Sequence, residues 1–368
     1  MVLVIYMGIA ELKDWFQKKR KFILPTAFVA GFVFDYLTLN RIDQLYENIV
    51  LLSYVLISGV GIAFSKRLSG YLQTFTPTIM QFVFGGLFSA FLVFYSRSAS
   101  LIASWPFLLV LLTLLVGNEF LKKHYSQLLF QLSIYYFILF SYFIFVLPVI
   151  LGRLGSFIFI ASGISSLGVM WLFSRGLRKI YPHEIENIKR KLIWSVGGIF
   201  LIINIFYFTN VIPPIPLSLK EAGVYYAIER TSESTYFTKD IDRKWYETLH
   251  RYKRMPIKPG DEVYTFSSVF APTDLKTNIV HNWHRYNQIT ERWESVTKIE
   301  FVVTGGRDGG YRGFSKKSNL KPGYWRTDIE TPNGLLIGRV KFLVLRQNLT
   351  TQTTHATIVV VKSALNNS

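Results

Sequence analysis

The sequence contains no cysteine. This absence excludes thiol nucleophiles, disulfide bridges and zinc sites built from cysteine ligands. The chain also lacks a recognisable catalytic signature, and no group of side chains stands at metal-ligand spacing. We therefore predict no catalytic residues, no metal site and no cofactor.

Charged residues are scarce. They make up 17% of the chain, below the roughly 25% that is usual in soluble domains, whereas hydrophobic residues make up 50%. The net charge is nevertheless +18, which by itself would fit a nucleic-acid partner. In the first half, however, the basic residues stand in short segments beside apolar runs, where membrane proteins need them for orientation. We therefore predict a membrane protein that does not bind nucleic acid.

Seven apolar segments approach the length of about 20 residues that a helix needs to cross a bilayer. They are residues 22–39, 49–64, 77–95, 101–117, 128–151, 156–173 and 193–212. Pro213, Pro214 and Pro216 follow the last segment and block helix continuation, because proline lacks the N–H group. The pattern predicts an all-α membrane bundle of seven transmembrane helices over residues 22–212, after a cytoplasmic tail at 1–21 and before a proline-rich hinge at 213–218.

The basic residues indicate how the bundle is oriented. The N-terminal tail and the segments after the second, fourth and sixth spans hold 15 Lys and Arg residues, whereas the other three loops hold 3. Under the positive-inside rule the first set faces the cytoplasm. The N-terminus is then cytoplasmic, and the C-terminal domain lies on the periplasmic or extracellular side of the inner membrane. The lipid bilayer is the expected partner of the bundle. The most basic loop, 174–192, is predicted to contain a short amphipathic helix.

Two polar side chains inside the spans are candidates for function. Asp35 lies near the outer end of the first span, and Asn204 lies in the middle of the seventh. An ionisable group inside a membrane is a functional candidate by default, because its burial is costly. Asp35 is also only about one turn from the predicted interface, where it can reach water, so an interfacial role is the alternative.

After the hinge, short β-rich runs alternate with turn sequences. Candidate strands are residues 224–230, 262–271, 278–286, 292–296, 298–303, 311–315, 324–330, 335–345 and 357–361. Asn333-Gly334 stands between two of them, and Asn-Gly is the strongest short signal for a hairpin turn. Short strands at close spacing predict an all-β, immunoglobulin-like sandwich over residues 219–368.

The segment 239–255 has apolar residues at helical spacing, among them Trp245, with basic residues such as Arg251 and Arg254 around them. This pattern predicts a basic amphipathic helix. Such a helix suits a membrane surface, and the hinge would keep it near the bilayer. The alternative is that its apolar face covers the core of the sandwich.

A series of short motifs runs through the β-rich domain in a fixed order. They are His281-Asn282-Trp283, the segments 311–317 and 320–325, and Asn333-Gly334 followed by two leucines. Their order and spacing resemble the bacterial family called domain of unknown function 2914, over about residues 260–345. The resemblance implies a module that often forms the C-terminal part of a membrane protein in the bacterial envelope. It implies no assigned activity and no catalytic residues.

Ligand-binding candidates come from several strands of this domain. His281 and Trp283 share one face of a predicted strand, whereas His284, three residues after His281, takes the opposite face, so the two histidines are not expected to share a metal. Arg312 stands beside Tyr311, and Arg326 stands close to Tyr324. An arginine next to an aromatic ring can bind a carboxylate or phosphate while the ring stacks on a sugar, so both positions are candidates for ligand binding.

Alternation along the strand 324–330 separates two faces. It places Tyr324 with Arg326 and Asp328, and places Trp325 on the opposite face, which we predict to be in the core. A charged face that is simply solvated is the alternative to a ligand site.

The sequence thus predicts an integral membrane protein that displays a non-catalytic sandwich outside the cytoplasm. The sandwich is expected to bind an envelope polymer such as a carbohydrate, or a partner protein. One alternative is a transporter or enzyme with its site in the bundle, near Asp35 and Asn204. A second alternative is a sensor that passes binding on the sandwich to the cytoplasmic loop.

Overall fold

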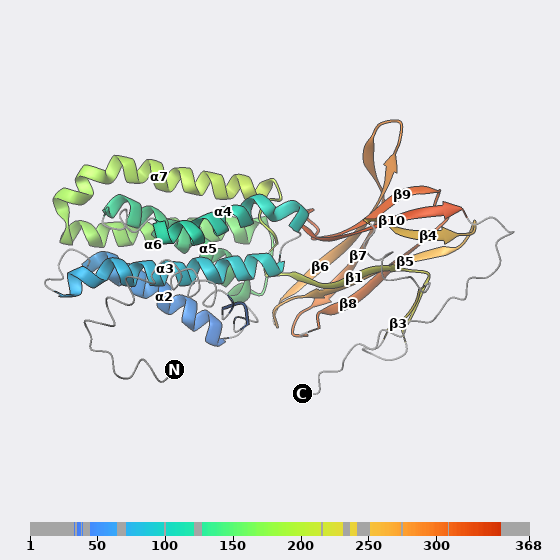
Figure 1. Cartoon of the computed structure of the whole chain (residues 1–368), viewed down its shortest axis with the longest axis horizontal. Helices are drawn as coiled ribbons and strands as arrows, with labels where there is room; N and C mark the ends of the chain where they lie inside the picture. The colour runs from blue at the N-terminus through green and yellow to red at the C-terminus, as the bar shows by residue number, and fades with distance from the viewer. Residues whose placement is uncertain are drawn as a thin grey trace, which may run out of the picture.

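The structure is a computed structural model of the whole chain. It describes residues 33, 35–37, 39, 45–64, 71–98, 101–120, 127–214, 216–230, 236–240, 251–273, 275–307 and 309–346. Helices occupy the first part of the chain and strands the second, and the two parts lie at opposite ends of the molecule (Figure 1). The predicted order, a helical bundle followed by a β domain, is confirmed.

The described helices match the predicted spans closely. They are α2 (Leu45–Phe64), α3 (Tyr71–Ser98), α4 (Leu101–Phe120), α5 (Leu128–Leu151), α6 (Ser156–Ile180) and α7 (Pro182–Phe208). Within the described residues, four of them, α2, α5, α6 and α7, are long and apolar enough to cross a membrane, and α3 and α4 contain shorter apolar stretches. Most of the first predicted span lies outside the described residues, so the number of crossings stays a prediction.

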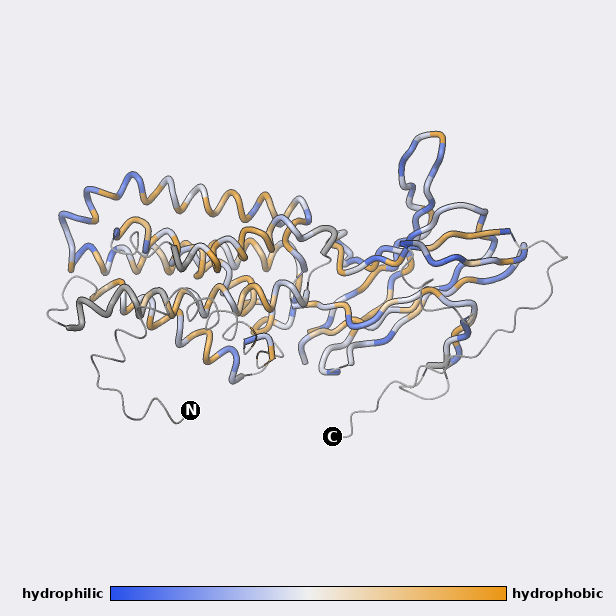
Figure 2. The backbone as a smooth tube through the Cα atoms, viewed as in Figure 1, coloured by the Kyte–Doolittle hydropathy of each residue, from blue (hydrophilic) through white to orange (hydrophobic). Residues whose placement is uncertain are grey.

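The segment 174–192 differs from its prediction. It is not a loop with a separate short helix, because α6 continues to Ile180 and α7 begins at Pro182. Proline is favoured at the first position of a helix, where its missing N–H has no partner to lose. The hydroxyl of Tyr181 donates a hydrogen bond to the carbonyl oxygen of Ala63 on α2 at 2.9 Å. The resulting α6–α7 hairpin has its hydrophilic end far from the β domain (Figures 1 and 2).

Aromatic side chains fill the centre of the bundle. Tyr95 of α3 lies with its ring 4.7 Å from the rings of both Phe107 of α4 and Phe145 of α5. Gly163 of α6 permits a close approach, since a Cβ atom there would lie 2.9 Å from Phe200 of α7. In Figure 2 orange, the colour of hydrophobic residues, recurs along these helices, whereas the turn between α6 and α7 is blue. Helix α5 is the most enclosed of the four long apolar helices, and α7 is the most exposed.

The β domain consists of two main sheets. Their strands are β1 (Ser218–Tyr225), β5 (Glu262–Phe270) and β8 (Tyr311–Ser318) in one sheet, and β4 (Lys253–Ile257), β10 (Leu336–Arg346), β9 (Gly323–Glu330), β6 (Lys276–Asn287) and β7 (Arg292–Thr304) in the other, each in spatial order. A small third sheet pairs β2 (Ala227–Arg230) with β3 (Tyr236–Lys239). The two main sheets face each other across a common core, which confirms the predicted sandwich.

Most predicted strands are present, with three differences. The predicted strands 292–296 and 298–303 form the single strand β7, which contains a bulge opposite Trp283 and His284. The predicted strand 224–230 is divided at Tyr226 between β1 and β2. The predicted strand 357–361 lies outside the described residues.

The predicted helix over 239–255 is wrong at both ends. Lys239 belongs to β3, and Lys253 to Met255 belong to β4, which pairs in parallel with β10. Met255 is completely buried in the sandwich core, so an apolar residue read as part of a helical stripe is a strand residue. Residues 241–250, which include Trp245, lie outside the described residues. The membrane-surface role predicted for Trp245, Arg251 and Arg254 therefore loses the continuous helix on which it depended.

Two tryptophans and a phenylalanine form the centre of the sandwich. Trp283 and Phe342 are fully buried, and Trp325 is 2% exposed, which confirms its predicted place in the core. The rings of Trp325 and Phe342 are stacked with centroids 6.5 Å apart, and Trp283 meets Phe342 edge-on. The indole N–H of Trp325 donates to the carbonyl oxygen of Lys321 at 2.8 Å. The polar edge of the ring is therefore satisfied despite its burial.

The bundle and the sandwich bury side chains in each other. Leu335, in the hairpin between β9 and β10, packs into the core of the bundle. Leu154, in the loop between α5 and α6, packs against the core of the sandwich. The segment 213–218, predicted to be a hinge, is buried at every described position. It therefore connects two docked domains.

Substitution of Trp325 by alanine should destabilise the sandwich by about 3–5 kcal/mol, because it removes a large side chain and leaves a cavity. Urea unfolding of the fragment 216–368, followed by circular dichroism, measures the change. Ile289→Ala is the matched control, since Ile289 is 93% exposed and a surface substitution is expected to change stability by less than about 0.5 kcal/mol. Equal unfolding midpoints for the two variants would contradict the core assignment.

Candidate functional site

The five-stranded sheet turns one face to the sandwich core and the other away from it. On β9, Trp325, Thr327 and Ile329 point inward, and the hydroxyls of Thr327 and Thr265 of β5 lie 2.9 Å apart across the two sheets. Alternation then directs Tyr324, Arg326, Asp328 and Glu330 outward. We call this second surface, with its neighbours on β4, β10, β6 and β7, the outer face.

Asp328 lies at the centre of the outer face and holds its cations together. The Arg339 side chain of β10 donates from Nε to Oδ1 at 2.5 Å and from Nη2 to Oδ2 at 2.7 Å. Arg326 Nη2 lies 3.3 Å from Oδ2, and His284 Nε2 lies 3.6 Å from it. The Asp328 side chain is only 6% exposed. The Asp328–Arg339 ion pair is therefore bidentate and largely buried, so its geometry is well defined and the other side chains of the site are arranged around it.

More positive than negative charge gathers around this carboxylate. Lys341 of β10 is directly opposite Arg326 of β9 in the sheet. Burial lowers the pKa of Lys341, and the nearby charges of Arg251, Arg339 and Arg326 lower it further, while Asp328 acts in the opposite direction. Because Asp328 is already engaged by Arg339, the remaining cations lack a full complement of negative charge. An anion bound here would relieve their mutual repulsion.

A second polar group continues the outer face toward β7. The Asn282 amide nitrogen donates to Glu330 Oε1 at 3.0 Å, and the Ser295 hydroxyl donates to Asn282 Oδ1 at 2.6 Å. Lys298 Nζ lies 4.0 Å from Glu330 Oε1. Burial raises the pKa of Glu330, although the Asn282 hydrogen bond and Lys298 act against that rise. This end of the outer face supplies hydrogen-bond donors and acceptors, and it carries a smaller surplus of positive charge than the region around Asp328.

Aromatic rings border the charged centre on both sides. The Arg326 guanidinium lies 4.7 Å from the ring centroid of Trp293 on β7, and the ring of Tyr286 meets that of Trp293 at 5.3 Å. On the other side, the rings of Tyr252 and Tyr324 lie 4.9 Å apart, and Lys341 lies 5.9 Å from the Tyr252 ring. Cations placed between aromatic surfaces form a surface suited to planar or ring-shaped acidic ligands.

His284 faces this cluster without a hydrogen bond. Within the described part of the chain, neither of its ring nitrogens has a hydrogen-bond partner. Burial lowers its pKa, and Arg326, Arg339 and Lys298 lower it further, whereas Asp328 raises it. The imidazole is therefore neutral at physiological pH, with one N–H to donate and one nitrogen to accept.

The structure separates the ligand-binding residues predicted from the sequence. Tyr324 and Arg326 lie together on the outer face. Arg312 lies on β8, paired with Ser268 in the three-stranded sheet, on the opposite side of the sandwich from Arg326. His281 and Trp283 are completely buried between the sheets, so a ligand on the surface does not reach them.

His281 instead forms a polar cluster inside the sandwich. Its Nε2 lies 2.8 Å from the Ser267 hydroxyl and its Nδ1 lies 2.8 Å from the Ser315 hydroxyl, to which the Trp283 indole N–H also donates at 3.0 Å. The cluster links three strands of the two sheets with every ring nitrogen satisfied, as buried polar groups require. His281 and His284 point to opposite sides of β6, as predicted. Among the described residues, no group of side chains is arranged to hold a metal ion.

The two membrane candidates have different surroundings. The Asn204 side-chain amide donates to the carbonyl oxygen of Phe200, one turn earlier in α7, at 2.8 Å. Its hydrogen bond is thus local to its own helix. Asp35 is half-buried in a part of the chain of which few neighbours are described.

The sequence predicts only the part of the site that lies on β9. Alternation along this strand places Asp328 beside Arg326, but it does not assign His284, Arg339 and Lys341 to the same surface. Alternation along residues 336–346 does direct Arg339 and Lys341 to one face. What the sequence lacked was the register that sets Arg339 against Asp328 and Lys341 against Arg326.

Fold and site together define a class: a protein with a bundle of long apolar helices joined to a β-sandwich that carries a cationic, aromatic-bordered face. Residues 276–344 match the family model described as "Protein of unknown function (DUF2914)". The family resemblance predicted for the C-terminal region is therefore confirmed. The matched segment runs from β6 to β10 and includes Asp328, Arg326, Arg339 and Lys341 of the outer face, but not Arg251 and Tyr252.

Comparison with other known proteins adds little. No curated protein matches the chain at a significant level. Among solved structures, an immunoglobulin-like protein from Pseudomonas aeruginosa is 12% identical, with 35% of this chain and 96% of that protein covered and a TM-score of 0.20. An alkylpurine DNA glycosylase, AlkC, from Pseudomonas fluorescens is 10% identical, with 83% and 99% covered and a TM-score of 0.22. Scores this low carry no inference, and the immunoglobulin-like topology stays a prediction.

The buried histidine should make the sandwich sensitive to acid. Burial lowers the pKa of His281 to about 3, whereas an unfolded histidine titrates near 6.5. Because the unfolded chain then binds more protons, stability is complete above about pH 6.5 and is lost as the pH falls toward 3. Between pH 7 and pH 4 the loss attributable to His281 should be about 3 kcal/mol.

Urea unfolding of the fragment 216–368 at several pH values measures this loss. His281→Gln keeps a polar side chain but removes the titration, so the difference between wild type and variant isolates His281 from His284. Parallel pH profiles for the two proteins would show that His281 is not buried as a neutral ring.

Proposed function

We propose that this protein is a membrane-anchored binding module whose outer face holds an acidic carbohydrate polymer of the cell envelope. The observation that carries the proposal is the gathering of cations on this face: Arg326 and Lys341 lie near Asp328, whose carboxylate Arg339 already engages, and Arg251 lies near Lys341. The function is non-catalytic binding. It belongs to the sandwich, and the helices serve to place that domain at the membrane.

The chemistry of the outer face favours carboxylate-bearing sugars. Arginine presents a planar fork of donors that matches a carboxylate, and its position over Trp293 keeps that fork oriented. Tyr324 is 39% exposed and offers a ring on which a sugar can stack. Neutral His284 and Asn282 add donors and acceptors suited to hydroxyl groups. A partner protein would meet the same cations, but the aromatic rings on both sides fit a chain of rings better.

The location of the ligand follows from the proposed orientation. The basic end of the α6–α7 hairpin, which holds Arg178 and Lys189, lies at the end of the bundle far from the sandwich (Figure 1). If that end faces the cytoplasm, in accord with the positive-inside rule, the sandwich lies outside. The proposal includes seven crossings of the inner membrane, a cytoplasmic N-terminus and an outer domain of immunoglobulin-like topology.

Binding should depend on the cations of the outer face. The double variant Arg251→Glu with Lys341→Glu is expected to weaken binding of polygalacturonate to the purified protein at least about tenfold, because a charge-assisted hydrogen bond contributes ~1.5–3 kcal/mol. Calorimetry at low ionic strength measures the affinity, and added salt should weaken it. Dextran, a neutral polymer, should not bind.

The matched control is Arg312→Glu, which reverses a charge on the three-stranded sheet, opposite the outer face. It should leave the affinity for polygalacturonate unchanged. An equal loss in this control, or no binding of the acidic polymer by wild type at low salt, would overturn the proposal.

The orientation has its own test. Alkaline phosphatase fused after Ser368 should be active, because that end of the chain is proposed to lie outside the cytoplasm. Phosphatase fused after Ile180, at the turn between α6 and α7, should be inactive. The opposite pattern of activities would place the sandwich in the cytoplasm and remove its envelope ligand.

A further inference from the structure

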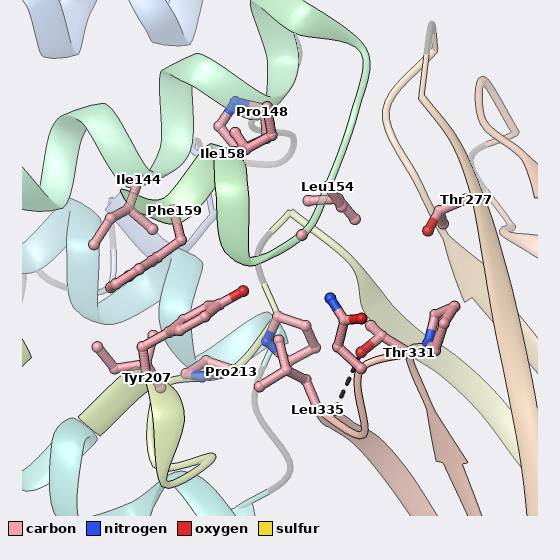
Figure 3. A pocket seen from close by; sticks show the side chains of 15 residues that line it. Ile144, Pro148, Leu154, Ile158, Phe159, Tyr207, Pro213, Thr277, Thr331 and Leu335 are labelled. Carbon is pink, nitrogen blue, oxygen red and sulfur yellow. Dashed lines mark hydrogen bonds between the residues drawn. The ribbon is translucent and has the colours of Figure 1, made fainter. Parts of the chain in front are cut away.

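A cavity of about 160 Å³ lies where the bundle meets the sandwich. It is bounded by the end of α5, the start of α6, the end of α7 and the hairpin between β9 and β10 (Figure 3). We call it the junction cavity. Cavities of about 150 Å³ lined by aliphatic side chains accept molecules the size of benzene. The junction cavity therefore has room for a short stretch of hydrocarbon.

The two walls of the junction cavity differ in chemistry. The helices contribute mostly apolar side chains, among them Ile144, Pro148 and Ile158, together with the ring and hydroxyl group of Tyr207 (Figure 3). The sandwich contributes hydroxyl groups from Thr277 of β6 and Thr331 of the β9–β10 hairpin, on the side away from the helices (Figure 3). A ligand that fits both walls has an apolar part in contact with the bundle and a polar part in contact with the sandwich.

Both walls are held in place by their own contacts. The rings of Phe159 and Tyr207 are stacked with centroids 3.7 Å apart at an angle of 9°. In the hairpin, the backbone N–H of Leu335 donates to the Thr331 hydroxyl at 3.1 Å, and the Thr331 N–H donates to the Leu335 carbonyl at 3.0 Å. Because Leu335 is itself buried in the bundle, the space between the walls cannot close by a simple shift of the hairpin.

Exposed apolar side chains surround the same end of the bundle. Ile150 at the end of α5 is 73% exposed, Phe157 at the start of α6 is 81% exposed, and Phe208 at the end of α7 is 57% exposed. Large apolar groups on helices of this length face lipid in a membrane protein. In a bilayer, lipid chains would therefore lie beside the end of the bundle that contains the junction cavity.

We propose that the junction cavity binds the ester-proximal part of one acyl chain of a phospholipid from the leaflet next to the sandwich. The chain contacts the apolar wall formed by Ile144, Pro148 and Ile158, and the ester region lies toward Thr277 and Thr331. The site is separate from the outer face and does not depend on what that face binds. A bound chain fills the space between the two domains and so becomes part of their interface.

Photolabelling of the full chain in nanodiscs tests the proposal. The probe is a phosphatidylcholine with a diazirine in one acyl chain, and labelled peptides are mapped by mass spectrometry. With its diazirine on a carbon close to the ester, the acyl-chain probe should label the β9–β10 hairpin at residues 331–335, because the hairpin lines the cavity where the ester end of the chain is proposed to lie. A probe with the diazirine in the headgroup should not label it from within the cavity.

Variants that fill the cavity separate specific binding from contact with bulk lipid. Ile158→Phe should lower labelling of the hairpin at least about tenfold, since one methylene alone changes binding in an apolar pocket by about tenfold or more. Ile160→Phe is the matched control on the same helix, because Ile160 is 41% exposed and points to lipid. It should leave labelling of the hairpin unchanged.

A second pair of variants approaches the cavity from the sandwich. Thr277→Phe fills it from β6, whereas Thr290→Phe adds the same ring at the exposed tip of the β6–β7 hairpin. A melting curve for each variant shows that it is folded. Labelling confined to the lipid-facing side chains in wild type, or equal labelling of the hairpin in Thr277→Phe and Thr290→Phe, would overturn the proposal.

Discussion

Two leucines, the buried Leu335 and the partly buried Leu154, pack across the domain boundary in opposite directions and join the bundle to the sandwich. Leu335 of the sandwich is buried among bundle side chains, and Leu154 of the bundle packs against the sandwich core. Burial of a leucine side chain contributes about 1.5–3 kcal/mol. A rotation of one domain about the proline-rich connection would return both leucines to water. The direction in which the outer face points, and the shape of the junction cavity, both depend on this mutual burial.

Several charged side chains of the outer face are largely shielded from water. Shielded ion pairs contribute little net stability, because loss of hydration offsets their attraction. The pair between Asp328 and Arg339 has close geometry and Arg326 shares the same carboxylate, yet Lys341 and Arg251 add positive charge that repels the two arginines. Stability alone does not account for such an arrangement, whereas the acidic ligand that we propose would compensate the surplus positive charge. Perturbed ionisable groups gathered on one surface are typical of binding sites.

The sequence predicted those parts of the structure that depend on local pattern. The bounds of α5 follow from the length of one apolar run, and β9 and β10 follow from alternation and the Asn333-Gly334 turn. It failed where distant contacts decide. Met255 continues a helical spacing of apolar residues that begins at Trp245, but residues 253–255 pair with β10 as a strand. His281 carries a polar side chain that alone suggests a surface, but Ser267 and Ser315 satisfy it in the core. Neither partner is near in sequence, and only the fold brings them together.

The parallel pairing of β4 with β10 has a consequence for the order of assembly during synthesis. In the five-stranded sheet, β4 has no neighbour except β10, which is the last strand that the structure describes. Strand β4 therefore stays unpaired, with Met255 unburied, until its partners in β10, about 90 residues later in the chain, have been synthesised. Until then the nascent domain displays an incomplete edge, the kind of surface that aggregates or recruits chaperones. The five-stranded sheet can therefore be completed only after β10 has been synthesised, so this step comes late in the folding of the β domain.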